Sequence, residues 1–182
     1  MQNNNPKPTP FAYILTCRTY GTWLHGDSRE SVDRYHNEFL TPKIKPNTGL
    51  QKAMEKNCKE DIFVMNVAQR EIVLQSVIDT CRSANWYLHA AHVRSNHIHI
   101  VLQTEKKPEQ AMISLKAYAT RYLKKEYPEM ERKHFWSLGE STGYLYRPEY
   151  IAAAVHYVIE EQGEKMAYYK ETLDVKITLL YD

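Results

Sequence analysis

The sequence predicts an α+β fold: a ferredoxin-like, split βαβ arrangement with an antiparallel sheet and an added C-terminal helix. Three observations support this prediction. The expected elements follow one another in the order β-α-β-β-α-β-α. The expected strands are short and rich in β-branched and aromatic residues, whereas the expected helices carry apolar residues at helical spacing. A length of 182 residues suits one domain whose core is large enough to be stable without disulfide bonds or a structural metal.

The N-terminal part is expected to hold one strand and one long insertion. Residues 1–10 are polar and proline-rich, and we expect a disordered lead there. Phe11–Thr19 is rich in aromatic and β-branched residues and predicts the first strand. Residues 28–60 are polar, and two prolines and a glycine interrupt any period, which predicts an irregular insertion.

The middle of the chain predicts a helix followed by two paired strands. Asn66 can cap a helix that runs to about Ser83, because apolar residues recur at helical spacing between them. Trp86–Val93 and His97–Gln103 read as strands. The short segment Arg94–Asn96 joins them as a tight turn, so the two strands are expected to pair.

Two further helices and one strand are expected after these. A proline opens the helix Pro108–Glu126, and another proline just beyond it forbids continuation. Gly143–Arg147 is a short strand candidate, and the last helix runs from Pro148 to Gly163. The domain is thus expected to span residues 11–165. Residues 166–182 form a mixed tail in which 175–180 is the candidate edge strand.

The composition excludes several classes of protein. Lys and Arg number 24 against 22 Asp and Glu, so the net charge is only +2 and a nucleic acid would need a local basic patch. The 14 tyrosines are compatible with base stacking. The three cysteines are widely spaced, which predicts reduced thiols in a cytoplasmic protein. Neither a secretion signal nor a membrane span is expected.

The most informative motif is His97-Ile98-His99 in the third expected strand. Alternate side chains of a strand share a face, so the two imidazoles should point the same way, about 7 Å apart. Two neutral imidazoles on a rigid strand supply half of a metal site. A third protein ligand is then needed, with positions left open for a substrate oxygen.

The last helix offers that ligand and a nucleophile. Tyr157 lies in mid-helix, and a carboxylate or amide one turn later would lie on its face. A phenol beside a divalent metal can attack phosphorus while the metal polarises a phosphoryl oxygen. At 100° per residue, Glu161 lies about 40° from Tyr157 around the helix and Gln162 about 140° away. Helix geometry alone therefore favours Glu161. Tyr150, two turns earlier, is the alternative nucleophile.

With these motifs in place, the chain resembles the single-tyrosine HUH transposases, namely the small insertion-sequence enzymes and their REP-associated relatives. HUH denotes His–hydrophobic–His, which His97-Ile98-His99 matches, and Asn96 before it also matches. In that family a C-terminal helix carries the nucleophilic tyrosine and, shortly after, a metal-binding amide. Tyr157 and Gln162 fit that description, although many members place the amide four residues after the tyrosine rather than five. The resemblance favours Gln162. It extends over residues 11–165 and includes Tyr20–Asp27, Leu115–Arg121, Phe135–Ser137, Gly139 and Ser141.

The resemblance implies an activity and its partners. The enzyme would cleave and rejoin single-stranded DNA, often beside a hairpin, through a 5′-phosphotyrosine intermediate at Tyr157. Mg²⁺ or Mn²⁺ would bind His97, His99 and the helix residue. Family members are typically dimers, so a homodimer acting on DNA in the bacterial cytoplasm is expected, without a membrane partner.

Other polar residues have two interpretations each. Lys116 and Arg121 give the Pro108–Glu126 helix a basic side, which is either a solvated face or a set of phosphate contacts. His89 and His92 lie on the strand paired with the histidine motif, where one of them either supports the metal ligands or packs. His25 and Asp27 could line the site, or Asp27 could instead cap a turn.

Three other functions compete with an autonomous transposase. A domesticated REP-associated nuclease would have the same sequence features. A non-catalytic DNA-binding protein on the same scaffold is disfavoured because His97, His99 and Tyr157 are all present. A metal hydrolase that uses a metal-bound water would need a general base in place of the tyrosine.

Overall fold

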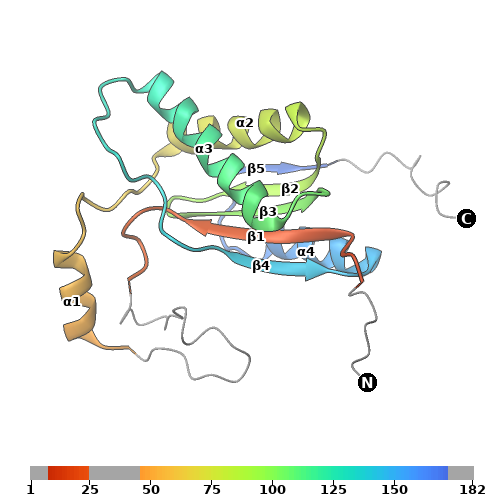
Figure 1. The fold of residues 1–182 in the computed structure, drawn as a ribbon, viewed down its shortest axis with the longest axis horizontal. Helices are drawn as coiled ribbons and strands as arrows, with labels where there is room; N and C mark the ends of the chain where they lie inside the picture. The colour runs from red at the N-terminus through yellow and green to blue at the C-terminus, as the bar shows by residue number, and fades with distance from the viewer. Residues whose placement is uncertain (1–7, 25–45, 172–182) are drawn as a thin grey trace, which may run out of the picture.

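The computed structural model describes residues 8–24 and 46–171. Five antiparallel strands form one sheet in the order β4-β1-β3-β2-β5, with α2 and α3 on one face and α4 on the other (Figure 1). The elements are β1 (Ala12–Arg18), α1 (Thr48–Lys56), α2 (Val67–Ser83), β2 (Tyr87–Val93), β3 (His97–Gln103), α3 (Pro108–Glu126), β4 (Ser141–Leu145), α4 (Pro148–Glu160) and β5 (Ala167–Lys170).

The predicted α+β fold class is confirmed. Strands β4, β1, β3 and β2 lie side by side in the order expected of a split βαβ sheet, with α2 and α3 as its two crossover helices. Helix α4 is the added helix, and it covers the face that α2 and α3 leave open. Strand β5 then extends the sheet beside β2.

Most element boundaries follow from local chemistry that the sequence shows. Asn66 and Gln69 form a reciprocal capping box, with distances of 2.9 and 3.0 Å between each side chain and the other residue's backbone N–H, so α2 begins where it was expected. Pro108 and Pro148 each occupy the first position of a helix, where no backbone N–H is needed. Strand β4 begins at Ser141, two residues earlier than expected.

Two expectations for irregular segments are corrected. The insertion at about 28–60 contains the regular helix α1, because the Asn47 side chain accepts the Leu50 N–H and offsets the cost of Gly49 in the first turn. The tail contains β5, which pairs with β2 and buries Ala167. The candidate edge strand at 175–180 and most of the disordered lead lie outside the described residues.

The alternation of side chains on β1 and β3 divides the interior into two cores. Ile98 and Ile100 point toward α2 and α3, in the larger core. Val101 points the other way and packs on Val158 and Ile159 of α4. His97 and His99 lie on the same face of β3 as Val101, at the end of the strand beyond the apolar contacts with α4.

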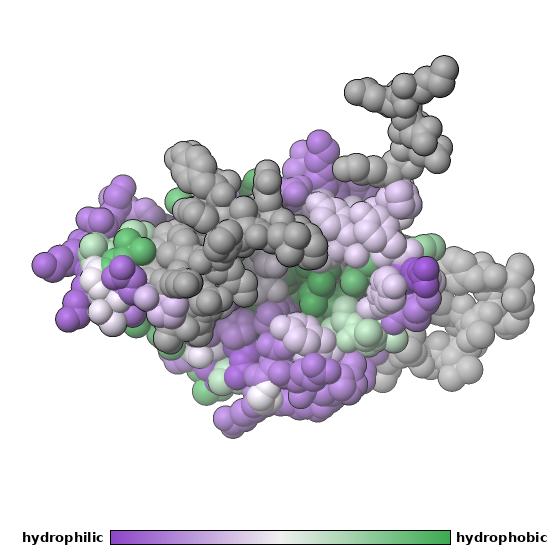
Figure 2. Space-filling view, turned by 90° about the horizontal axis from the view of Figure 1, so that it is seen from below, coloured by the Kyte–Doolittle hydropathy of each residue, from purple (hydrophilic) through white to green (hydrophobic). Residues whose placement is uncertain are grey.

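No helix within residues 8–24 and 46–171 is both long enough and apolar enough to cross a bilayer. Seen from below, apolar residues are visible in a recess near the middle of the molecule between hydrophilic residues, and others lie toward the left of the view (Figure 2).

Candidate active site

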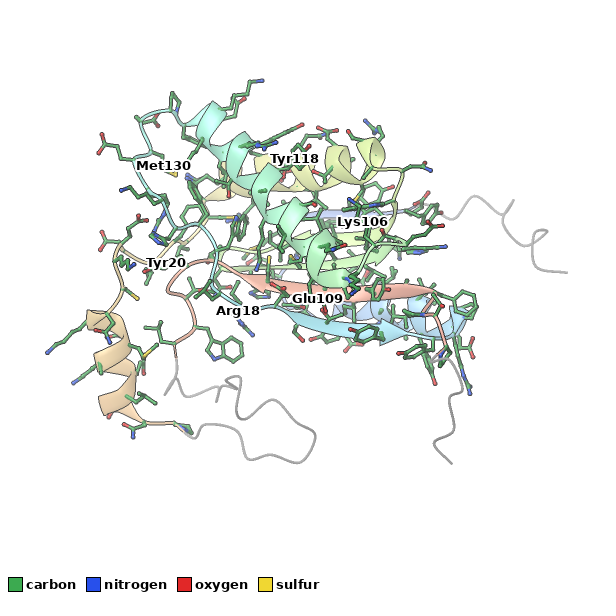
Figure 3. The ribbon with its side chains drawn as sticks, in the orientation of Figure 1. Arg18, Tyr20, Lys106, Glu109, Tyr118 and Met130 are labelled. Atoms are coloured by element: carbon green, nitrogen blue, oxygen red, sulfur yellow. The ribbon has the colours of Figure 1, made fainter. Side chains whose placement is uncertain are left out.

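His97 and His99 lie next to each other on one face of β3, as their spacing predicts. Their ring centroids are 4.8 Å apart and the ring planes meet at 81°. On the adjacent strand β1, Arg18 pairs with His97 and Thr16 pairs with His99. Figure 3 shows Arg18 extending from β1 on the side away from α3, which is the side of the histidines.

Hydrogen bonds orient both imidazoles. The Oδ1 atom of Asn96 lies 2.7 Å from Nδ1 of His97, and an amide oxygen only accepts, so this Nδ1 carries the proton. The Oγ1 atom of Thr16 lies 2.7 Å from Nδ1 of His99. Both Nδ1 atoms are therefore engaged, and each ring has its Nε2 left as the candidate metal-binding nitrogen.

Burial keeps both rings neutral. It lowers the pKa of His97 to about 3, with further lowering by the nearby charges of His99, Arg18 and Arg94. Burial also lowers the pKa of His99 to about 4, although a hydrogen bond with Gln162 opposes the shift. Neutral imidazoles are the form that binds a metal, so the pair needs no deprotonation at neutral pH.

Tyr157 comes to this pair from α4. Val158 and Ile159 pack into the core, which places Tyr157 at the margin of the helix with 42% of its surface exposed. Its ring centroid is 5.9 Å from that of His99, with the planes at 75°. Tyr150 lies about 10 Å earlier along the helix axis, with the guanidinium of Arg147 5.8 Å from its ring.

The end of α4 separates the two candidate third ligands. The helix stops at Glu160, and the carbonyl oxygen of Tyr157 accepts both the backbone N–H of Glu161 and the Nε2–H of Gln162, each at 3.2 Å. The Gln162 side chain also opposes the lowering of the His99 pKa. The Glu161 carboxylate instead lies 3.1 Å from the exposed His156 ring. Because the helix ends at Glu160, Gln162 is not turned a further 100° or so per residue away from Tyr157. The structure therefore brings Gln162 to the histidine pair.

The donor set fits a divalent cation. Among the described residues, no three His, Cys, Asp or Glu side chains gather as a metal cluster. A metal here would bind the two imidazoles and the Gln162 amide, and that small set leaves coordination positions for substrate oxygens. His97, His99 and Gln162 as ligands stay predictions.

Three contributors to the site were missed by the sequence analysis. Thr16 and Arg18 could be assigned only from the register of β1 on β3, which the sequence does not reveal. Arg94, in the turn between β2 and β3, donates its Nη1–H to the carbonyl oxygen of Glu164 at 2.8 Å. Arg18 is the cross-strand partner of His97, and the backbone N–H of Arg94 donates to the His97 carbonyl oxygen at 2.9 Å. The positive charges of both arginines lower the pKa values of the histidine pair.

The two histidines on β2 differ. His92 is fully buried on the α4 face, as the cross-strand partner of His99. His89 lies at a bulge in the pairing of β2 with β3, with its ring centroid 4.7 Å from that of Tyr87. His89 thus packs against Tyr87, and its buried Nε2 has no hydrogen-bond partner among the described residues. The contacts of His92 connect it to α4. His25 and Asp27 lie outside the described residues.

Lys116 and Arg121 lie on the opposite face of the sheet from the histidines. The Nζ of Lys116 is 2.8 Å from a carboxylate oxygen of Glu140, and the Lys116 side chain is only 15% exposed. The guanidinium of Arg121 is 5.0 Å from the ring of Tyr118, which Figure 3 shows on α3. The structure does not bring these cations to the histidine pair, and their contact with DNA stays a prediction.

The match to a known family places this protein among the transposases, which are DNA-processing enzymes. The model for the family described as "Transposase IS200 like" matches residues 43–165, more than half of the chain. The chain therefore belongs to the IS200-like transposase family, as the resemblance predicted.

Two of the similar solved structures are described as transposases. One is a REP-associated tyrosine transposase bound to a REP hairpin, with 10% identity and a TM-score of 0.48 over 88% of this chain and 72% of that chain. The other is a candidate transposase from Deinococcus radiodurans, with 14% identity and a TM-score of 0.43 over 89% of this chain and 98% of that chain. No curated protein matches the sequence.

Proposed function

We propose that this transposase cleaves and rejoins single-stranded DNA with Tyr157 as its nucleophile, and that a divalent cation such as Mg²⁺ or Mn²⁺ binds at His97, His99 and Gln162. The observation that carries the proposal is the 5.9 Å separation of the Tyr157 and His99 rings within one chain. Most tyrosines in a tyrosine-rich chain only pack. This one is 42% exposed and lies beside two neutral imidazoles.

The proposed reaction exchanges one phosphate ester for another. The Oη of Tyr157 attacks the scissile phosphorus and loses its proton to solvent, so a bond forms between the phenol oxygen and phosphorus. The bond from phosphorus to the 3′ oxygen breaks, and that oxygen takes up a proton. The products are a 5′-phosphotyrosine link and a free 3′-hydroxyl, which can reverse the reaction on another DNA end. A bound divalent cation would polarise a phosphoryl oxygen during both steps.

The chain supplies further charge for a phosphodiester. Arg18 and Arg94 flank the histidine pair, and guanidinium groups form strong, charge-assisted hydrogen bonds with phosphate oxygens. These cations suit a polyanionic substrate better than a neutral one. The overall charge of +2 is consistent with such local recognition.

A covalent-adduct assay tests the proposal. The protein is incubated with 5′- and 3′-labelled hairpin-bearing single strands and Mn²⁺, and the adduct is detected on a denaturing gel. We expect an adduct with the 5′ end of the downstream fragment that Tyr157→Phe abolishes. Tyr150→Phe, on the same helix, is the matched control and should retain it.

Other outcomes would assign the alternatives. If the DNA is cleaved without an adduct, and Tyr157→Phe still cleaves it, the protein is a hydrolase that uses a metal-bound water. Binding across many sequences without cleavage would mean a non-catalytic DNA-binding module. Light scattering of the free and DNA-bound protein tests the expected homodimer. Because Tyr157 lies near His99 of its own chain, we propose that each subunit supplies its own nucleophile.

A further inference from the structure

His92 is a fully buried histidine whose two ring nitrogens both have backbone partners. Nδ1 lies 2.9 Å from the carbonyl oxygen of Val158 in α4, and Nε2 accepts the backbone N–H of Met166 at 3.1 Å. A carbonyl only accepts and a backbone N–H only donates, so the proton is on Nδ1 and the lone pair is on Nε2. The ring therefore joins β2 to α4 and to the segment that leads into β5.

The bond to Val158 lies at a point where α4 needs a partner. Counted back from the C-cap Glu161, the last four carbonyls of α4 have no N–H from a following turn, and Val158 is the first of them. The His92 imidazole satisfies this carbonyl from the neighbouring strand. Val158 follows Tyr157 directly, and His92 is the cross-strand partner of His99. One side chain thus connects β2, the strand beside the histidine pair, to the turn that presents the tyrosine.

We propose that His92 is a positioning residue: by capping the C-terminal turn of α4 it holds Tyr157 and Gln162 against His99. This inference rests on the proposed function for its effect on catalysis. The capping itself does not depend on which residue is the nucleophile. His92 touches neither the substrate nor the metal in this proposal, and acts through the end of the helix.

Three substitutions separate the two hydrogen bonds. The amide of Asn branches at Cγ, where Nδ1 is attached, so His92→Asn keeps a donor for the Val158 carbonyl. The amide of Gln lies one bond further, near the position of Nε2, so His92→Gln keeps an acceptor for Met166. His92→Leu keeps neither. Val77→Ala, which removes a buried side chain of α2 in the other core, is the control for general loss of packing.

The first measurement is hydrogen exchange at the end of α4 in the protein without metal. We expect His92→Leu and His92→Gln to lose protection in a peptide covering residues 157–163, and His92→Asn and Val77→Ala to retain it. The second measurement is Mn²⁺ affinity by titration calorimetry, where loss of a supporting hydrogen bond typically costs about 10- to 100-fold. The same two variants should show this loss, and adduct formation should fall with it while hairpin binding is unchanged.

Two results would overturn the proposal. The first is that His92→Asn, His92→Gln and His92→Leu do not differ from one another in hydrogen exchange at the end of α4 or in Mn²⁺ affinity. The second is that Val77→Ala loses as much exchange protection and Mn²⁺ affinity as His92→Leu does. If His92→Leu fails to fold, the contrast between Asn and Gln still decides. Hydrogen exchange is measured without DNA or a covalent adduct. It therefore tests the capping role of His92 even if the wild-type protein forms no adduct.

Discussion

The side chain of Gln162 folds back so that its Nε2 donates to the carbonyl oxygen of Tyr157 at 3.2 Å. The same side chain opposes the lowering of the His99 pKa that burial causes. The candidate nucleophile and the candidate third ligand therefore belong to one hydrogen-bonded unit at the end of α4. A continuous helix would have turned Gln162 about 140° away from Tyr157, so the position at which α4 ends determines the composition of the site.

Removal of the Gln162 amide should weaken metal binding more than removal of the neighbouring carboxylate. We expect Gln162→Ala to lower Mn²⁺ affinity at least about tenfold, as loss of a ligand or its support does. Glu161→Ala should change it little, because that carboxylate lies beside the exposed ring of His156. Calorimetric titration of both variants with Mn²⁺ measures this. The reverse ranking would assign the ligand to Glu161.

Loss of the Thr16 hydroxyl should impair the site without unfolding the sheet. Thr16→Val keeps the β-branched shape but removes the 2.7 Å contact with Nδ1 of His99, which leaves the ring free to change tautomer and orientation. We expect Mn²⁺ affinity and the rate of adduct formation each to fall about 10- to 100-fold.

The control for Thr16→Val is Thr80→Val, a buried threonine on α2 whose hydroxyl donates to the Ser76 carbonyl. It should leave Mn²⁺ affinity unchanged. If both variants lose affinity equally, the effect is one of stability and Thr16 has no specific role.

The fold was predictable because its local signals are strong. Asn66 with Gln69 forms a capping box, and Pro108 and Pro148 mark the first positions of two helices. Strand β5 was missed because four residues are too few to show an alternating pattern, and its pairing with β2 depends on tertiary structure.

The site was predictable in its chemistry and only partly in its contacts. The spacing of His97 and His99 alone predicts that their side chains share one face of the strand. Thr16 and Arg18 depend on strand register, and the reach of Gln162 depends on where α4 ends. Both features arise from packing between segments that are far apart in the chain, so no local pattern could indicate them.

The three thiols should differ in reactivity. Burial raises the pKa values of Cys17 and Cys81 to about 12, so almost no thiolate forms at pH 8. Cys58 is half-buried and unpaired. We expect one thiol to react rapidly with a maleimide in the native protein and all three in urea. Peptide mapping identifies the site, and rapid native labelling of Cys17 or Cys81 would contradict the burial argument.

Glu60 should contribute to stability only above acidic pH. Desolvation alone would raise the pKa of its carboxyl, but hydrogen bonds from the His134 side chain and from the backbone N–H groups of His134 and Lys133 lower it from 4.5 to about 2. A carboxyl with a lowered pKa stabilises the folded state above the unfolded value of about 4.5, and this contribution is lost as the pH falls toward 2. Urea unfolding of the wild type and of Glu60→Gln should show a stability difference that shrinks as the pH falls from 4.5 to 3. A difference that stays constant to pH 3 would mean that the charge of Glu60 has no part in holding residues 133 and 134 in place.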